Sequence, residues 1–380
     1  MALILGIESS CDETAAAVVR DGEHLLSNVV SSQISTHLPY GGVVPELASR
    51  EHLRAIVPVV RQAVAEAGIS LEQIDALAVT QGPGLAGSLL VGITYAKALS
   101  FSLGKPLIAV NHLEGHIHAV LLQHRRTSSE LRLPALALVV SGGHTHLFLV
   151  ERNENGRWRY RNVGRTLDDA AGEAFDKVSK LLGLSYPGGP IIEKLAQQGN
   201  AKAIPLPLSQ IKVRQKRQAQ QQELPESYDF SFSGIKTAVL RFVETHGLKD
   251  SIERRKQSLM GKAQITPDDY LKHLDPLTLD LIASFQEAVV QDLARKTMRA
   301  AQDFEAESLI VTGGVASNRR LRQEFTSRAD REGLRVFFPQ PGLSTDNAAM
   351  IAAAADSKFQ ASEFAGPHVS AEASLPLGSS

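Results

Sequence analysis

Cysteine is almost absent from this chain: Cys11 is the only one among 380 residues. A single cysteine cannot close an intrachain disulfide, and it excludes a zinc site built from several thiolates. Cys11 is also a weak candidate for a nucleophile, as is Ser9, because no base lies near either in the sequence. An isolated cysteine is more often a small buried apolar residue. We therefore expect a protein of a reducing compartment.

An excess of charge of either sign is lacking too. The 40 Lys and Arg residues nearly balance the 41 Asp and Glu residues, for a formal net charge of -1. Proteins that bind nucleic acid on their own are usually basic, because neutralised phosphates supply much of the affinity. Any RNA contacts are therefore expected from local patches or from helper subunits. With 43% hydrophobic and 21% charged residues, the chain is globular and long enough for two domains.

Two kinds of long apolar segment are missing as well. We find no apolar run approaching the length that spans a bilayer. Residues 1–14 lack the basic region and the extended apolar core of a signal peptide. These observations predict a soluble, cytoplasmic protein without a membrane partner.

The apolar runs predict strands and helices whose order occurs twice. The first set is strands 2–8, 14–20 and 25–31, helix 44–68, strand 76–80, helix 85–103, strand 107–110 and helix 113–123. The second set is strands 135–140, 146–151 and 158–163, helix 169–182, strand 308–312, helix 315–331, strand 336–339 and helix 346–356. Two such sets predict an α/β protein with two ribonuclease-H-like lobes and a cleft between them.

The lobe boundaries follow from this order. We assign residues 1–125, with about 345–358, to an N-terminal lobe, and residues 133–343 to a C-terminal lobe. Charged stretches at about 211–226 and 249–273 interrupt the second lobe and are expected to be exposed insertions. Residues 359–380 are small and polar, which predicts a flexible tail.

The strongest local motif is Asn-His-Leu-Glu-Gly-His at residues 111–116. His112 and His116 are four residues apart, so one face of a helix would present both imidazoles to one metal ion. Two ordinary surface histidines remain an equally open alternative. A zinc peptidase would need a Glu directly after the first His. Leu113 occupies that position and Glu114 lies on a different face, which argues against peptidase chemistry.

A third metal ligand is needed, and Asp346, expected in the first turn of an alanine-rich helix, is the candidate. A carboxylate favoured by the helix dipole is the alternative reading, and the residues alone slightly favour it. Two histidines and one aspartate would suit iron(II) or zinc and leave positions open for a substrate.

Four glycine-rich turns lie at residues 81–84, 140–145, 186–190 and 312–318. Glycine lets the backbone approach a ligand, and free N–H groups at a helix start bind phosphate. Each turn alone is ordinary, but four together favour a nucleotide-binding cleft without a Walker lysine. Asp12 and Glu13 follow the first strand, where carboxylates approach phosphate and metal in two-lobed nucleotide enzymes; a simple turn role for Asp12 is equally open.

Taken in order, these motifs resemble the TsaD family, formerly called Gcp or O-sialoglycoprotein endopeptidase. The resemblance covers about residues 3–356. It rests on residues 6–14 (GIESSCDET), 40–52 (YGGVVPELASREH), 81–87 (QGPGLAG), 111–116, 140–145, 169–177 (DAAGEAFDK), 186–190, 230–237 (FSFSGIKT), 313–319 and 344–352.

The resemblance implies an actin-like fold of the actin/hexokinase (ASKHA) superfamily and a tRNA-modifying acyltransferase. Such an enzyme moves the threonylcarbamoyl group from threonylcarbamoyl-AMP to the adenosine 3′ of the anticodon, in tRNAs that read codons beginning with A. Implied partners are tRNA, TsaB- and TsaE-type helpers and a TsaC-type adenylate supplier, with a homodimer left open. An ATPase or kinase of the same superfamily is the main alternative, and a metallo-glycoprotease a weaker one.

The same resemblance assigns site residues. His112, His116 and Asp346 match the ligands of one divalent metal, Fe²⁺ or else Zn²⁺. Positions matching the substrate site are Val139, Val140, Ser141, Gly142, Gly143, Asp176, Gly189 and Asn318. Asp12, Glu13 and His144 are candidates for proton transfer. Archaeal and eukaryotic members have a metal-reaching Tyr where this chain has Val139, so three protein ligands are expected here.

Overall fold

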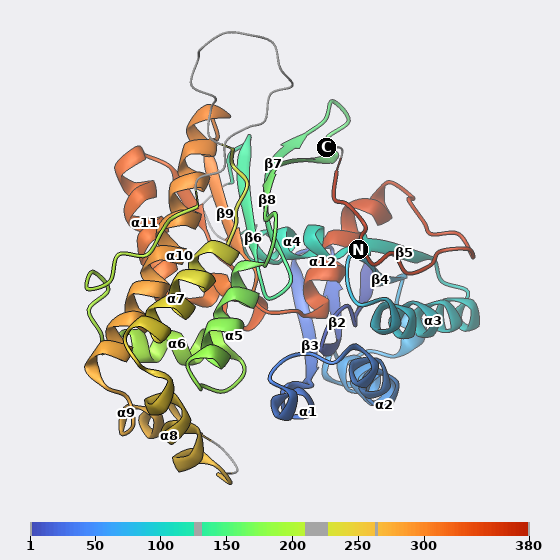
Figure 1. Cartoon of the computed structure of the whole chain (residues 1–380). Coiled ribbons are helices and arrows are strands. Elements are labelled where there is room, and N and C mark those ends of the chain that lie inside the picture. Colours follow the sequence, from blue (N-terminus) through green and yellow to red (C-terminus); the bar gives the residue numbers. More distant parts are fainter. Residues whose placement is uncertain (1, 125–130, 210–226, 263–264, 379–380) are drawn as a thin grey trace, which may run out of the picture.

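The fold is built around two five-stranded sheets (Figure 1). The computed structural model describes residues 2–124, 131–209, 227–262 and 265–378. The first sheet has the order β3-β2-β1-β4-β5. Its strands are β1 (Leu3–Glu8), β2 (Glu13–Arg20), β3 (His24–Ser32), β4 (Ala76–Gly82) and β5 (Leu107–Asn111).

The second sheet repeats this topology, with the order β8-β7-β6-β9-β10. Its strands are β6 (Ala135–Val140), β7 (Thr145–Arg152), β8 (Trp158–Arg165), β9 (Ser308–Thr312) and β10 (Arg335–Phe337). In each sheet the first strand pairs antiparallel with the second and parallel with the fourth. The predicted duplication is therefore confirmed.

Helices cover both faces of the first sheet. α2 (Pro45–Glu66) and α3 (Ala86–Leu103) share one apolar core with it, which includes Leu5, Ile56 and Leu89. α12 (Ala348–Gln360) packs on the other face. Its alanines are small enough to let a helix lie close to the strands, and a Cβ on Gly6 would lie 2.4 Å from the carbonyl oxygen of Ala348. Short turns of helix are α1 (Ile34–His37), η1 (Leu38–Tyr40) and η2 (Leu71–Gln73).

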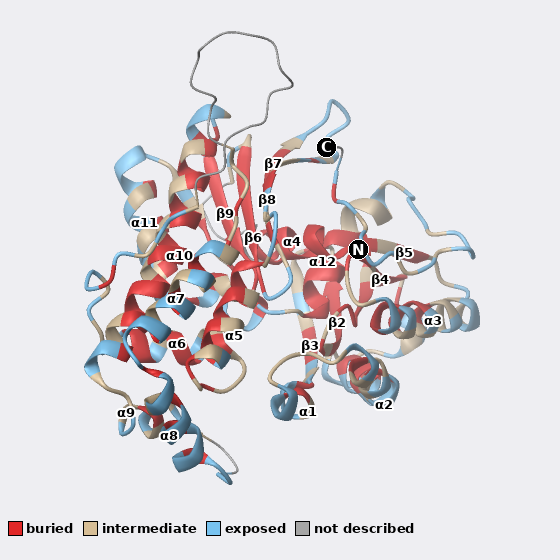
Figure 2. Ribbon diagram, viewed as in Figure 1, coloured by how far each residue is buried: buried red, intermediate tan, exposed pale blue. Residues whose placement is uncertain are grey.

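The second sheet packs against a larger helical layer on one face (Figures 1 and 2). That layer contains α5 (Ala171–Leu181), α6 (Gly188–Ala196), α7 (Ser233–Thr245), α10 (Pro276–Asp303) and α11 (Arg319–Glu332), with η3 (Gly314–Ser317) before α11. The other face packs against α4 (His112–His124), through Leu113 and Ile117 among others. Because Ala119 and Leu122 of α4 join the core around α12, α4 and α12 lie between the two sheets.

One of the two charged stretches can be compared with its predicted character. The other, residues 211–226, lies outside the described residues. In the stretch at about 249–273, α8 (Lys249–Leu259) and α9 (Pro267–Leu271) form, and Ile252, Leu259 and Tyr270 are buried in the second core. This stretch is therefore anchored on the lobe by three apolar side chains, whereas its overall charge predicted an exposed insertion.

The last residues have defined contacts where composition predicted a flexible tail. Ala365 N–H donates to Leu107 O at 2.7 Å, and Glu372 N–H donates to Gln81 O at 3.0 Å. The Asn111 amide donates to Leu375 O, and Leu377 is buried beside α4 and the second sheet. The segment therefore crosses from the first lobe to the second.

One helix corrects the prediction about apolar runs. α3 is long and apolar enough to cross a membrane by length and composition, with a mean hydropathy of 1.3 over Ala86–Leu103. No other helix among the described residues combines this length and apolar character. Leu89, Ile93 and Ala96 of α3 are buried in the core of the first lobe, which accounts for their apolar character by packing.

Candidate functional site

The two histidines of the motif enter the site from the start of α4. β5 runs directly into this helix, and the Asn111 side-chain oxygen accepts the N–H of Leu113 at 2.9 Å. His112 is thus the first helical residue and His116 lies one turn later. Asp346 comes from the loop between η4 (Pro341–Leu343) and α12. All three therefore meet where the two lobes join.

The predicted His-His-Asp group is brought together by the fold. The Nε2 atoms of His112 and His116 lie 3.6 and 3.2 Å from Oδ1 of Asp346. One ligand atom from each residue lies within 4.8 Å of the other two. Both histidines are buried. Among the described residues, Nδ1 of His116 has no hydrogen-bond partner, and Nε2 of His116 has only the Asp346 contact. Buried polar atoms are normally satisfied, so this donor set fits a divalent cation, and the group could hold one.

Charge within this cluster shifts the pKa values of its members. Burial alone would raise the pKa of Asp346, but the neighbouring histidines hold it well below its ordinary value. Burial opposes the charged form of His112, yet the carboxylates of Asp346 and Glu8 raise its pKa to about 9. The negative charge of Asp346 and Glu8 thus favours a positive charge between them, which a cation would also supply.

Glu13, a candidate for proton transfer, is close enough to the cluster for the charge of Asp346 to act on it, and Asp12 is its neighbour. Asp12 is 7% exposed. Burial raises the pKa of Glu13 well above its ordinary value, and the charges of Asp346 and Asp12 add to the effect. Burial and Asp12 likewise raise the pKa of the Cys11 thiol, so Cys11 stays a thiol rather than a nucleophilic thiolate.

His144 approaches the cluster from the second lobe. Its ring centroid lies 5.9 Å from that of His112 and 5.7 Å from that of His146. Burial, and then the nearby imidazole of His112, lower the pKa of His144 to about 3. The ring is therefore neutral at physiological pH.

The glycine turns of the second lobe meet near the same place. A Cβ on Gly313 would lie 2.4 Å from the carbonyl oxygen of Val140, and one on Gly172 would lie 2.6 Å from that of Ser141. Gly313 also has φ +96°, which glycine adopts without strain. Gly142 and Gly143 are exposed, and a Cβ there would meet no neighbour within 4 Å. Their backbone is thus open to a ligand.

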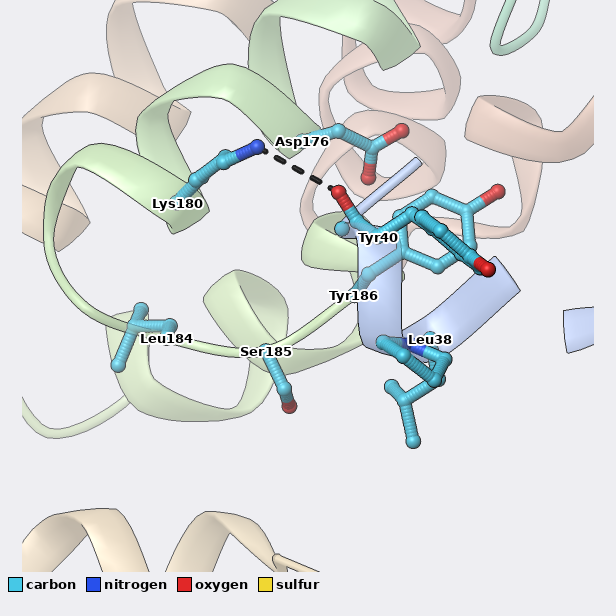
Figure 3. A pocket seen from close by; sticks show the side chains of 9 residues that line it. Leu38, Tyr40, Asp176, Lys180, Leu184, Ser185 and Tyr186 are labelled. Atoms are coloured by element: carbon cyan, nitrogen blue, oxygen red, sulfur yellow. Dashed lines mark hydrogen bonds between the residues drawn. The ribbon is translucent and has the colours of Figure 1, made fainter. Parts of the chain in front are cut away.

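Asp176 lines a cavity of about 250 Å³ between segments of the two lobes (Figure 3). Tyr40 contributes from η1, and Lys180 and Tyr186 from the second lobe. Lys180 Nζ lies 3.5 Å from the Tyr40 carbonyl oxygen, the contact drawn in the figure. Asp176 accepts the N–H of Gly188 at 2.7 Å. Burial nevertheless raises its pKa to about 6.

The remaining predicted substrate positions have different surroundings. Gly189 follows Gly188, whose N–H binds Asp176. The backbone of Gly189 is open to a ligand, since a Cβ there would meet nothing within 4 Å. The Asn318 side chain is already engaged: its oxygen caps α11 through the Leu321 N–H, and its nitrogen donates to Gln286. Val139 and Val140 bury their side chains in the two cores, so they have only backbone atoms to offer a ligand.

Sequence reasoning missed Glu8, which lies behind His112. Its Oε2 is 3.1 Å from Nδ1 of His112 and accepts the Thr80 hydroxyl at 2.7 Å. The available signal was a charged residue at the end of an otherwise apolar buried strand, residues 3–8. Tyr40 and Lys180 were also missed as lining residues, because nothing in the sequence brings them together.

The arrangement also excludes the peptidase alternative. Leu113 is buried against the second sheet. Glu114 points toward α12, where its carboxylate lies 3.3 Å from Lys358 Nζ. Nε2 of His118 forms a hydrogen bond of 2.9 Å with the Tyr160 hydroxyl, away from the cluster. No carboxylate follows the first histidine to act as the general base of that mechanism.

The fold and site together define a class: a two-lobed α/β protein with an actin-like fold and a His-His-Asp cluster at the lobe junction. Among solved structures, full-length HypF in its phosphate- and nucleotide-bound form is similar with a TM-score of 0.52 and 12% identity, covering 96% of this chain and 47% of that chain. A likeness at this identity supports the fold alone.

Sequence comparison then gives the family. The family model for TsaD, tRNA N6-adenosine threonylcarbamoyltransferase, matches residues 24–353. A transferase of that description from Koribacter versatilis (strain Ellin345) is 62% identical over 378 residues, 99% of each chain. One from Syntrophotalea carbinolica is 50% identical, covering 93% of this chain and 91% of its own. The chain belongs to the TsaD family and is a threonylcarbamoyltransferase that acts on tRNA. This decides against the ATPase or kinase alternative.

Proposed function

We propose that the chain transfers the threonylcarbamoyl group of threonylcarbamoyl-AMP to N6 of the adenosine 3′ of the anticodon, in tRNAs that read codons beginning with A. One divalent cation, Fe²⁺ in the cell, is held by His112, His116 and Asp346. The observation that carries this proposal is the meeting of these three side chains within 4.8 Å at the lobe junction. Its support is the family membership and the open glycine turns nearby.

In the reaction, the N6 amine attacks the carbamoyl carbon, a C–N bond forms, the C–O bond to the phosphate breaks, and AMP leaves. The donor is already activated, so the protein has to position the reactants and stabilise developing charge. A bound cation supplies Lewis-acid stabilisation of that charge without redox change. We propose that the exposed backbone of Gly142 and Gly143 and the turn at Gly189 bind the adenylate. Asp176, in its ionised form, accepts hydrogen bonds from the ribose hydroxyls.

The proton lost by the attacking amine needs an acceptor. His144 is adjacent to the cluster, so we propose that it relays this proton, directly or through water, toward solvent. Its lowered pKa means that it holds the proton only transiently. Burial and the neighbouring carboxylates raise the pKa of Glu13, which favours its protonated form. We propose that Glu13 in that form donates a hydrogen bond to the departing phosphate, with Asp12 as its neighbour. Asn318 would act through the amide hydrogen that it does not donate to Gln286.

Single-turnover transfer from purified threonylcarbamoyl-AMP to tRNA tests the proposal. We expect His112→Ala, His116→Ala and Asp346→Ala to lose the bound cation and to slow transfer by at least about 100-fold, as loss of a main electrostatic contribution does. His118→Ala is the matched control, because it removes a histidine of the same helix whose partner is Tyr160. Undiminished transfer by the cation-free variants would remove the cation from the mechanism.

The cellular setting is also proposed from the family. We propose that TsaB- and TsaE-type helpers assist the enzyme, that a TsaC-type enzyme supplies the adenylate, and that the reaction takes place in the cytoplasm. The near-neutral net charge supports a need for helper subunits in tRNA binding. Affinity purification of the tagged chain from its own cells, followed by identification of stoichiometric partners, tests this. A homodimer without helpers would contradict it.

A further inference from the structure

His112 is held on the side that faces away from the cluster. Its Nε2 is the nitrogen nearest Asp346, at 3.6 Å. Its Nδ1 lies 3.1 Å from Oε2 of Glu8 and 3.1 Å from Oγ of Ser10. The imidazole therefore lies between the candidate ligand Asp346 on one side and the first strand on the other.

The Glu8 carboxylate is itself fixed by the fold. It is the last residue of β1 and is fully buried. Its Oε1 accepts the Ser10 N–H at 2.5 Å, and its Oε2 accepts the Thr80 hydroxyl at 2.7 Å. Thr80 lies on β4, which pairs parallel with β1. A carboxylate buried in this way is costly unless it is well hydrogen-bonded, so its position beside His112 is closely defined.

We propose that Glu8 is a positioning residue for cation binding. By accepting the Nδ1–H of His112, it selects the tautomer whose Nε2 lone pair faces Asp346 and His116, and it orients the ring. A carboxylate behind a metal-ligating histidine has this effect in general, and its loss typically weakens metal binding 10- to 100-fold. The inference rests on the cation site proposed above.

The two imidazoles differ in this respect. In the part of the chain that the structure describes, Nδ1 of His116 has no hydrogen-bond partner, so no described side chain orients the second ring in a comparable way. Glu8 therefore acts through His112, and the effect of a Glu8 substitution should be absent once His112 is removed.

Zn²⁺ affinity of the full-length chain, measured without substrate by competition with a chromophoric chelator, tests the inference. We expect Glu8→Ala and Glu8→Gln to bind Zn²⁺ about 10- to 100-fold more weakly than the unsubstituted chain. Glu114→Gln is the matched control. Glu114 is a buried carboxylate on the same helix as His112, but its partner is Lys358. Its substitution should leave the affinity within about twofold of that of the parent.

A second measurement separates positioning from a merely structural role. In the Zn²⁺-loaded protein labelled with ¹⁵N-histidine, His112 should show a protonated Nδ1 and a ligated Nε2, and the Glu8 variants should lose this defined pattern. A structural role alone would lower the melting temperature of the metal-free protein and leave the pattern intact. If Glu8→Ala does not fold, two other variants replace it in both measurements. They are the isosteric Glu8→Gln and Thr80→Val, the second of which removes one hydrogen-bond donor to Glu8.

The two proposals fail in distinguishable ways. If the unsubstituted chain binds no Zn²⁺, the cation site fails and this inference fails with it. If the unsubstituted chain binds Zn²⁺ and both folded Glu8 variants bind within twofold of it, the inference alone is overturned.

Discussion

The carboxyl of Asp176 gives a quantitative test of the site's electrostatics. Burial raises its pKa from 3.8 to about 6. The folded state therefore favours the neutral acid. Between about pH 4 and pH 6 the unfolded chain has lost the Asp176 proton while the folded protein still holds it. The free energy of unfolding therefore falls as the pH rises through this range. The full penalty is at most about 3 kcal/mol. A functional role for the ionised carboxylate would explain why this penalty is tolerated.

Asp176→Asn removes the penalty while keeping an oxygen to accept the Gly188 N–H. The difference in unfolding free energy, variant minus parent, should grow by about 1 to 1.5 kcal/mol between pH 5 and pH 8. Urea unfolding followed by circular dichroism at several pH values measures it. The same variant should lower kcat/KM for threonylcarbamoyl-AMP, and in the parent kcat/KM should rise with pH through about 6.

Asp169→Asn is the control of opposite sign. Asp169 is bound by Lys177 and Lys236, and hydrogen bonds from these lysines outweigh its burial and lower its pKa. That carboxylate stabilises the fold above its unfolded pKa, so its substitution should cost stability near neutral pH and less in acid. The reasoning is refuted if the difference in unfolding free energy between Asp176→Asn and the parent stays constant from pH 5 to pH 8.

Three further predictions concern the framework of the site. Gly313→Ala should destabilise by about 1 to 3 kcal/mol, because its φ is +96° and a Cβ would lie 2.4 Å from Val140 O; thermal unfolding measures this. Leu377→Ala should cost about 2 to 3 kcal/mol if the C-terminal segment is docked as described, and no change in stability would mean a loose tail. Arg255→Met should be neutral or stabilising by up to about 2 kcal/mol, because Nε and Nη2 of this buried side chain have no partner; a loss of similar size would show that those nitrogens are satisfied.

The strands and the candidate metal-binding histidines were the predictable part of this protein. Strands of both sheets alternate with turns such as Asp21-Gly22, and that local chemistry predicts them well. His112 and His116 share a helix face, so their spacing is visible in the sequence. Asp346 could be added only from the family pattern, because a carboxylate before a helix has an ordinary explanation.

The rest depends on contacts between residues far apart in the chain. Glu8 and His112 are 104 positions apart, and only the folded sheet brings them together. Sequence analysis assigned no element to residues 276–303, which form α10. This helix is buried on nearly all sides and includes buried polar residues such as Asp292 and Lys296, so its sequence lacks a single apolar stripe. The C-terminal segment was missed because its docking uses backbone hydrogen bonds rather than a long apolar run.

Anomalous diffraction from crystals of the active, cation-loaded enzyme tests the central claim most directly. The account predicts a single strong peak about 2.0–2.2 Å from Nε2 of His112, Nε2 of His116 and a carboxylate oxygen of Asp346, a spacing typical of such ligands. A peak elsewhere, or no peak in protein that transfers at the full rate, would contradict it.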